Sequence, residues 1–126
     1  MKLLTLILDF LFPPSKEALK LRSLSPEEIN RELPPAPASP YHYINSLFAY
    51  KDPLASELIW SIKYKRDKHA IKCGGFALYK ALENKQAVLV PIPVSKERRK
   101  ERGYNQCELL VDEMVRISEG KLEKRF

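Results

Sequence analysis

Cysteine is scarce in this sequence, which excludes the small domains that are held together by disulfides. Only Cys73 and Cys107 carry a thiol among the 126 residues. Together with His42 and His69 they make four zinc-type ligands, of which only His69 and Cys73 stand one helical turn apart. A tetrahedral zinc site needs four such ligands at workable spacing, so we expect no metal site. The sequence thus fits a reducing compartment.

Long apolar runs are also missing. The strongest candidate, residues 1–12, is interrupted by Asp9, is followed by no small-residue cleavage site, and ends at Pro13-Pro14. A helix of this length cannot span a bilayer. We therefore expect residues 2–12 to form an amphipathic helix that docks on the domain, and the protein to be cytoplasmic without a membrane span.

The composition is that of a soluble globular protein, with 44% hydrophobic and 30% charged residues. The net charge of +6 is unevenly spread. Residues 1–50 hold five cations and five anions, whereas residues 51–126 hold 17 cations and 11 anions. An anionic partner should therefore bind the later part. The length suffices for one domain but is small for a complete doubly wound sheet with a ligand crevice.

Residues 87–110 are the stretch around which the chain is organised. The apolar, β-branched run Ala87–Ile92 predicts a strand that is covered on both faces, as in a parallel sheet, and two prolines end it. Residues 96–102 follow as a predicted loop with five cations, and Gly103 precedes a helical pattern. This order places cations and free backbone amides at one edge of a sheet, where an anion can bind.

The N-terminal part reads as a helical arm. Residues 16–22 suit either a helix or a loop, whereas Ser25 and Glu28 predict a capping box and a helix to about Leu33. Residues 33–40 are rich in proline and predict an extended linker with little backbone pairing. We therefore divide the chain into an arm with its linker, residues 1–40, and a domain, residues 41–126.

The domain should begin with a strand or hairpin arm at residues 41–50, which are rich in aromatic and β-branched residues. Asp52 and Asp67 then predict the N-caps of two helices, and Gly74-Gly75 inside the second predicts a close approach to a neighbouring element. A third helix should follow Gly103, with Asn105 and Gln106 in its first turn, and end at Gly120, with a charged tail after it.

A second basic segment lies between the first two helices of the domain. Residues 63–72 hold five cations and His69 against Asp67, with Tyr64 among them. One interpretation is a nucleic-acid patch, because cations contact phosphates and aromatic rings stack on bases. The other, which we favour, is a solvated turn between helices, because aromatic and basic residues do not alternate repeatedly. The candidate nucleic-acid contacts are Lys63, Lys65, Arg66 and Lys68.

The central stretch resembles the ComF family of competence-associated, phosphoribosyltransferase-like proteins. The residues that carry the resemblance are Val90-Pro91-Ile92-Pro93, Arg98 to Gln106, and Glu108-Leu109-Leu110. Weaker matches are Leu8 to Pro14, Phe48-Ala49-Tyr50, Pro53-Leu54 and Ile62 to Lys65. The resemblance implies an α/β fold, here a partial type I phosphoribosyltransferase-like domain with a parallel-sheet core strand flanked by helices and an N-terminal helical arm.

The resemblance also implies a ligand. Enzymes of this class transfer a phosphoribosyl group from phosphoribosyl pyrophosphate (PRPP), with Mg²⁺ screening the pyrophosphate. Pyrophosphate oxygens would then contact Arg99, Lys100 and Arg102, helped by the amides of Gly103 and Tyr104. Asn105 and Gln106 would either cap and support the loop, which we favour, or contact the ligand directly. The alternative for the arginines is a solvated loop.

Two features of the family are absent from the sequence. Its zinc-knuckle cysteines are missing, and so is the Thr-rich PRPP loop, because Asp112-Glu113 is followed by bulky residues on a helical pattern. We therefore expect a truncated relative, inactive as an enzyme by itself, whose basic loop retains phosphate affinity. The alternative is a nonenzymatic accessory of DNA uptake that binds single-stranded DNA through both basic segments. Its protein partners would be competence proteins. A third is a fragment whose open sheet edge awaits a partner segment.

Overall fold

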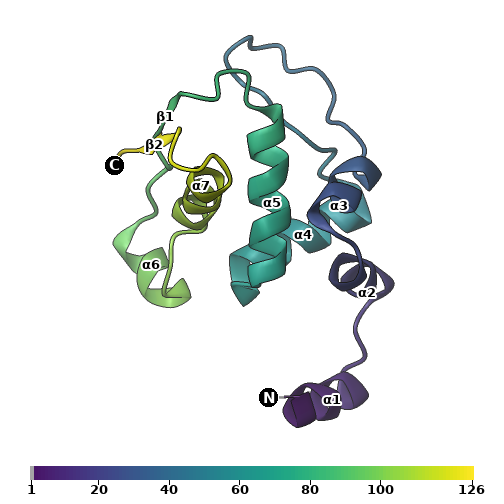
Figure 1. Ribbon diagram of the computed structural model, residues 1–126. Coiled ribbons are helices and arrows are strands. Elements are labelled where there is room, and N and C mark those ends of the chain that lie inside the picture. Colours follow the sequence, from purple (N-terminus) through teal and green to yellow (C-terminus); the bar gives the residue numbers. More distant parts are fainter. Residues whose placement is uncertain (1) are drawn as a thin grey trace.

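The computed structural model describes residues 2–126 and shows a mostly helical α/β protein with a small parallel sheet (Figure 1). Within this range the elements follow in the order α1 (Lys2–Leu11), α2 (Lys16–Ser23), α3 (Pro26–Glu32), α4 (Pro53–Lys65), α5 (Lys68–Ala81), β1 (Val88–Leu89), α6 (Lys96–Arg102), α7 (Gln106–Ile117) and β2 (Glu123–Lys124). None of these helices combines the length and the apolar character needed to cross a membrane.

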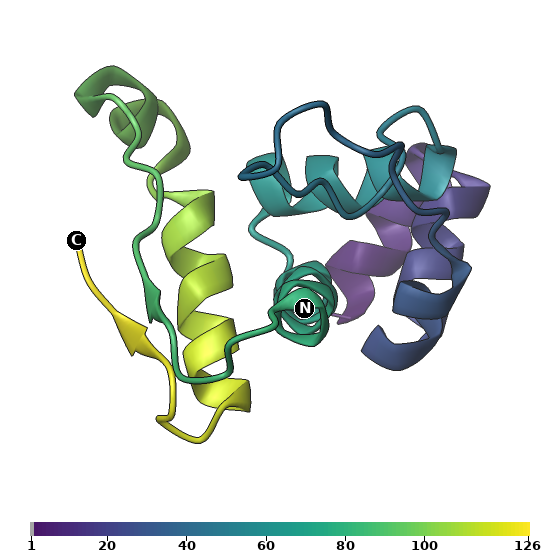
Figure 2. The same ribbon diagram turned by 90° about the horizontal axis from the view of Figure 1, so that it is seen from above.

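Helix α5 is the centre of the arrangement. It packs against α3 and α4 on one side and against α7 on the other, while α2 packs on α4. Figure 2 shows α5 nearly end-on between these two groups, with the two strands on the far side of α7. The basic helix α6 therefore lies at the α7 end of the molecule.

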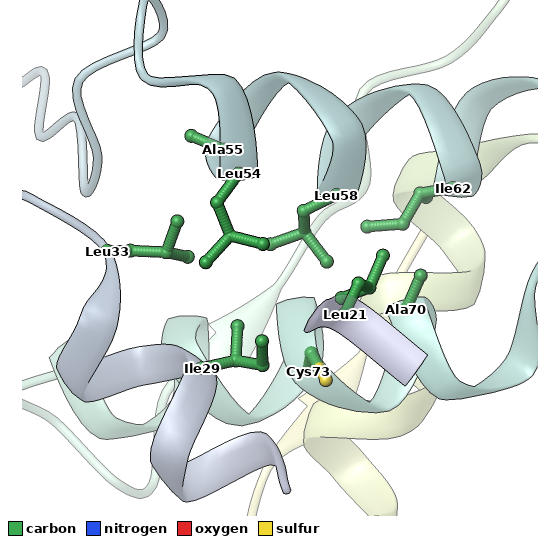
Figure 3. Close-up of a cluster of buried hydrophobic side chains, with 9 residues drawn as sticks. All are labelled: Leu21, Ile29, Leu33, Leu54, Ala55, Leu58, Ile62, Ala70 and Cys73. Atoms are coloured by element: carbon green, nitrogen blue, oxygen red, sulfur yellow. The ribbon is translucent and has the colours of Figure 1, made fainter. Parts of the chain in front are cut away.

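The buried core lies between α5 and the helices α2 to α4. Nine side chains form it and point toward one another in Figure 3: Leu21, Ile29, Leu33, Leu54, Ala55, Leu58, Ile62, Ala70 and Cys73. Apolar positions spaced by four residues along α4 explain its share of the core. Residues before and after residue 40 contribute to this one core. The division of the chain into an arm and a domain at residue 40 stays a prediction.

The N-terminal helices confirm the predicted capping box at Ser25 and show that residues 16–22, predicted as helix or loop, are helical. Ser25 accepts from the amide of Glu28 at 3.2 Å, and the Glu28 carboxylate accepts from the amide of Ser25 at 2.9 Å, which completes the capping box. Residues 16–23 are helical, with Ser15 as N-cap. The helix is favoured because the Ser15 hydroxyl satisfies the amide of Ala18 and Leu21 gains a buried position.

The proline-rich segment does pair its backbone, contrary to the prediction. Pro35 forms an antiparallel bridge with Phe48, and the amides of Ala36 and Ala49 donate to Leu47 and Pro34 at 3.1 and 3.0 Å. The predicted strand at residues 41–50 is reduced to this bridge. Because proline supplies no N–H, pairing cannot extend far along either segment. The contact folds the linker back onto the domain.

The caps and the glycine pair of the domain are confirmed. Asp52 accepts from the amides of Leu54 and Ala55 at 3.0 Å, and Asp67 accepts from the amide of Ala70 at 3.0 Å. A Cβ at Gly75 would lie 2.5 Å from Cγ of Glu113 on α7. Helices α5 and α7 therefore approach each other at a distance that only glycine permits.

The sheet differs from its prediction in length and cover. Strand β1 is confined to Val88–Leu89 and pairs in parallel with β2, which lies in the predicted charged tail. Val88, Val90 and Ile92 are 49 to 72% exposed, so the run is not covered on both faces. Since α6 and α7 lie between the strands in sequence, the parallel pair closes a crossover, as parallel strands require.

Residues 96–102 form a helix rather than the predicted loop. Ser95 caps it by accepting from the amide of Arg98 at 3.2 Å, and Gly103 ends it with φ of 77°. Lysine, glutamate and arginine all favour helices, so a short charged run between a cap and a glycine becomes helical. The cations are therefore spread around a helix instead of converging along one strip of loop.

Helix α1 does not dock on the domain as predicted. It has no buried residue, and in Figure 1 it lies apart from the body beyond α2. An ion pair links it to α2, in which Arg22 Nη1 donates to the carboxylate of Asp9 at 3.2 Å. Pro13-Pro14 follow directly and carry the chain away in an extended conformation. The helix forms where predicted, but its apolar side faces outward.

Candidate functional site

The cations of α6 are exposed, except for the partly buried Arg102, and most of them are unpaired. Arg99 donates to the carboxylate of Glu108 on α7 at 3.4 Å, and Arg102 donates to Oε1 of Gln106 at 2.5 Å. Lys100 makes neither a hydrogen bond nor an ion pair with another described residue. The exposed ion pair of Arg99 stabilises little, so the side chains of Arg99 and Lys100 can turn toward an anion at small cost.

The backbone at Gly103 is not free, contrary to the prediction. Its amide donates to the carbonyl oxygen of Arg99 at 2.7 Å and so closes α6. The side chain of Tyr104 is only 8% exposed, and its hydroxyl donates to the carbonyl oxygen of Ile62 at 2.7 Å. The same hydroxyl accepts from the amide of Arg66 at 3.2 Å. Tyr104 therefore joins the end of α6 to the end of α4.

Asn105 fixes the loop that leaves β1. Its side chain is 3% exposed; Oδ1 caps α7 by accepting from the amide of Cys107 at 2.9 Å, and Nδ2 donates to the carbonyl oxygen of Ile92 at 3.0 Å. One side chain thus ties the end of the strand run to the start of α7. Asn105 acts here as a cap and support, and Gln106 supports Arg102 from the next position.

The second basic segment lies where α4 ends and α5 begins. Lys63 and Lys65 belong to the last turn of α4, Arg66 ends it in the left-handed conformation with φ of 47°, and Lys68 starts α5. The Arg66 guanidinium lies 5.4 Å from the centre of the Tyr104 ring. The two basic segments of the sequence are therefore neighbours in space, joined by Tyr104.

Exposed aromatic rings lie among these cations. Trp60 and Tyr64, on successive turns of α4, are 49% and 58% exposed, and their ring centres are 5.6 Å apart. Lys65 Nζ lies 4.9 Å from the Trp60 ring centre, and the Arg102 guanidinium lies 5.5 Å from that of Tyr64. We call these four side chains the aromatic–cationic cluster. The sequence placed Tyr64 and Lys65 together in a possible nucleic-acid patch, but it could not show that Arg102 joins them, because Arg102 comes from a different element.

Cys73 and His69 are neighbours in the core and take part in packing. Burial, helped by the charges of Asp67 and Glu27, raises the pKa of the Cys73 thiol to about 11, which keeps it protonated. His69 Nε2 lies 3.7 Å from the Cys73 sulfur and donates to the carbonyl oxygen of Leu24 at 2.8 Å. Within the part of the chain that the structure describes, no three acidic, histidine or cysteine side chains gather as metal ligands.

The acidic pair on α7 is engaged in packing. Asp112 accepts from Lys124 Nζ on β2 at 2.9 Å, and Glu113 is paired with Arg116 while its side chain covers Gly75. Residues 114–117 continue the helix. The pair therefore ties α7 to its neighbours and is not followed by a phosphate-binding loop, as the sequence predicted.

Comparison with known proteins finds one informative similarity. Over 81 residues, 61% of this chain, the sequence is 37% identical to the competence protein ComFC of Bacillus subtilis strain 168. The aligned part is 33% of that protein, so the chain spans about a third of its length. No protein-family profile matches the sequence, and no solved structure matches the fold. The similarity supports a ComF-related, competence-linked origin.

Proposed function

We propose that this chain is a ComF-like, competence-related protein that binds single-stranded DNA in the cytoplasm, through the surface where α4 and α6 meet. The observation that carries the proposal is the aromatic–cationic cluster: two exposed, adjacent rings with Lys65 on one side and Arg102 on the other. Similarity to a competence protein supports the same conclusion. The expected partners are competence proteins that deliver or receive the strand.

The geometry suits an unpaired strand better than a duplex. A base can stack on an exposed ring, which contributes about 1–3 kcal/mol per base whatever the sequence. Lysine and arginine around the rings then contact the phosphates, and the release of counterions makes the binding depend on salt. In a duplex the base faces are hidden, so Trp60 and Tyr64 would contribute little. We therefore expect weak sequence preference and a marked preference for single strands.

The aromatic part of the proposal is tested by replacing both rings. Trp60→Ala with Tyr64→Ala should weaken binding of a fluorescent oligothymidine about 5-fold or more, as measured by anisotropy, because at least one stacked base loses its platform. Tyr41→Ala with Tyr43→Ala is the matched control, since these two exposed rings also lie together, with centres 5.7 Å apart, in a turn outside the cluster. Equal loss in both double variants would contradict the assignment of the site.

The cationic part is tested by charge reversal in both basic segments, at Lys68 on α5 and at Lys100 on α6. Lys68→Glu with Lys100→Glu changes two exposed lysines that have no partner among the described residues. The affinity should fall, and the slope of log K against log salt should become shallower by about 1.4, because two phosphate contacts are lost. Lys16→Glu with Arg31→Glu is the control, since it reverses two exposed charges on α2 and α3. An unchanged slope in the first variant would count against the proposal.

A phosphoribosyl-related function is the second candidate. The observation that favours it is that β1 leads directly into the cations of α6 and is paired in parallel with β2, as at the edge of a phosphoribosyltransferase-like sheet. Arg99, Lys100 and Arg102 would then hold the pyrophosphate of PRPP. Mg²⁺ would arrive as a complex with that pyrophosphate and screen its charge. The side chains, rather than the closed amide of Gly103, would make these contacts.

We expect this chain alone to bind pyrophosphate weakly and to catalyse no transfer. On α7 the acidic pair is engaged by Lys124 and Arg116 and is followed by helix, so it cannot hold a ribose beside a phosphate loop. Phosphorus NMR of PRPP with Mg²⁺ and an amine or base acceptor should show no turnover above the blank. Turnover that is lost in Lys100→Glu would show that the chain is an enzyme.

A further inference from the structure

Helix α1 is amphipathic, and it presents its apolar side outward. Its polar residues Lys2, Thr5 and Asp9 fall on one stripe, and Asp9 turns that stripe toward α2 through its ion pair with Arg22. On the rest of the circumference and just beyond it, eight leucine, isoleucine and phenylalanine side chains are 47 to 85% exposed. Helices on protein surfaces normally have the opposite orientation.

The exposed area is too large for an ordinary surface. These eight side chains together expose on the order of 1,000 Å², whereas the largest apolar patch on a typical monomer is about 300–600 Å². After the helix, Phe12 leads into Pro13-Pro14, which extend the chain, and Arg22 pairs with Asp9 on the polar side, so in this structure the apolar side faces away from α2. No described part of the chain covers this face, which leaves it available to a partner.

We propose that the outward face of α1 is the contact through which two copies of this chain form a dimer. The face is suited to a symmetric pair, because the same leucine and phenylalanine rows can interdigitate with a second α1 across a two-fold axis. Its area agrees with the dimer as well, since a standard interface buries about 800 Å² on each partner. No polar residue interrupts the apolar side.

The charges of α1 favour a second copy over a lipid surface. Helices that lie on membranes carry lysine and arginine on their polar side to attract anionic lipids. The polar stripe of α1 holds one cation, Lys2, and one anion, Asp9, and the anion is already paired within the chain. Electrostatic attraction to a membrane is therefore small, whereas a symmetric helix pair needs none.

The test measures the oligomeric state of the whole chain. Light scattering after size exclusion, from about 1 to about 100 µM, should show a concentration-dependent dimer, because interfaces of this size dissociate at micromolar concentration or below. Leu6→Glu with Phe10→Glu places two carboxylates on one row of the face and should weaken the dimer about 100-fold or more. Both side chains are exposed and glutamate favours helices, so the core is untouched.

Ile44→Glu is the control, because Ile44 is an exposed apolar residue in the turn after the proline-rich segment, and its dimer should match that of the unchanged chain. A Leu6→Cys variant in a Cys107→Ser background should form an intermolecular disulfide, which places the contact at α1. A monomer at every concentration, a dimer unaffected by the two glutamates, or α1-dependent binding to anionic vesicles without dimerisation would each overturn the proposal.

Discussion

The hydroxyl of Tyr104 holds the two halves of the proposed site together, and Tyr104→Phe removes that link alone. The hydroxyl donates to Ile62 at 2.7 Å and accepts from Arg66 at 3.2 Å. The Arg66 amide also donates to Ser61, so it stays satisfied without the tyrosine. The variant therefore loses the hydrogen bond to Ile62 and leaves the carbonyl oxygen of Ile62 without its donor. We expect a loss of about 1–2 kcal/mol.

Urea unfolding followed by circular dichroism measures this loss, which corresponds to a fall in Tm of roughly 4–8 °C for a chain of this size. Tyr50→Phe is the matched control, since Tyr50 is exposed and its hydroxyl bonds to no other described residue. Amide exchange at Arg66 should also become faster in Tyr104→Phe. A stability equal to that of the control, within about 0.5 kcal/mol, would refute the reasoning.

Two further predictions concern α5. Gly75→Ala should destabilise by about 1–2 kcal/mol, because the clash with Cβ and Cγ of Glu113 outweighs the helix propensity that alanine gains. In Gly74→Ala the new Cβ meets only the terminal methyl groups of Leu110 and Ile62, so its stability should stay within about 0.5 kcal/mol of the unchanged protein. If urea unfolding showed that Gly75→Ala is stabilised, the close approach of α5 and α7 would be contradicted. Burial raises the pKa of Cys73 from 9.0 to about 11, so the folded protein keeps a proton that the unfolded chain releases in this range. The unfolding free energy should therefore fall as the pH rises from 9 to 11. The unfolding free energy of Cys73→Ala should fall less steeply over the same range. Parallel curves for the two proteins would show that the thiol does not contribute.

Features that depend on a few consecutive residues could be predicted from the sequence. The caps at Ser25, Asp52 and Asp67 were confirmed because a side-chain acceptor and the amide it satisfies lie within three residues. The glycine pair of α5 was also interpreted correctly. Glycine lowers the stability of a helix, so two adjacent glycines inside one indicate that a neighbouring element comes close there.

Features that depend on tertiary contacts could not be predicted. The approach of Arg102 to Tyr64 arises from the packing of α7 on α5 and from the bonds of Tyr104, none of which has a local signal. The predicted loop at residues 96–102 was wrong because a run of charges was interpreted by its solvation instead of its helix propensity. The strand prediction at residues 41–50 was wrong because the segment beside it is rich in proline, which supplies no N–H to a ladder, so pairing stops at the single bridge of Pro35 with Phe48.

The pairing of β1 with β2 has a consequence for the order in which the chain folds. The two strands are separated by α6 and α7, so their ends meet only after both helices have formed and docked. The pair consists of only two residues on each strand, Val88–Leu89 and Glu123–Lys124. We therefore expect this ladder to close last during folding and to open first, which gives a passing strand of another chain brief access to Val88 and Val90.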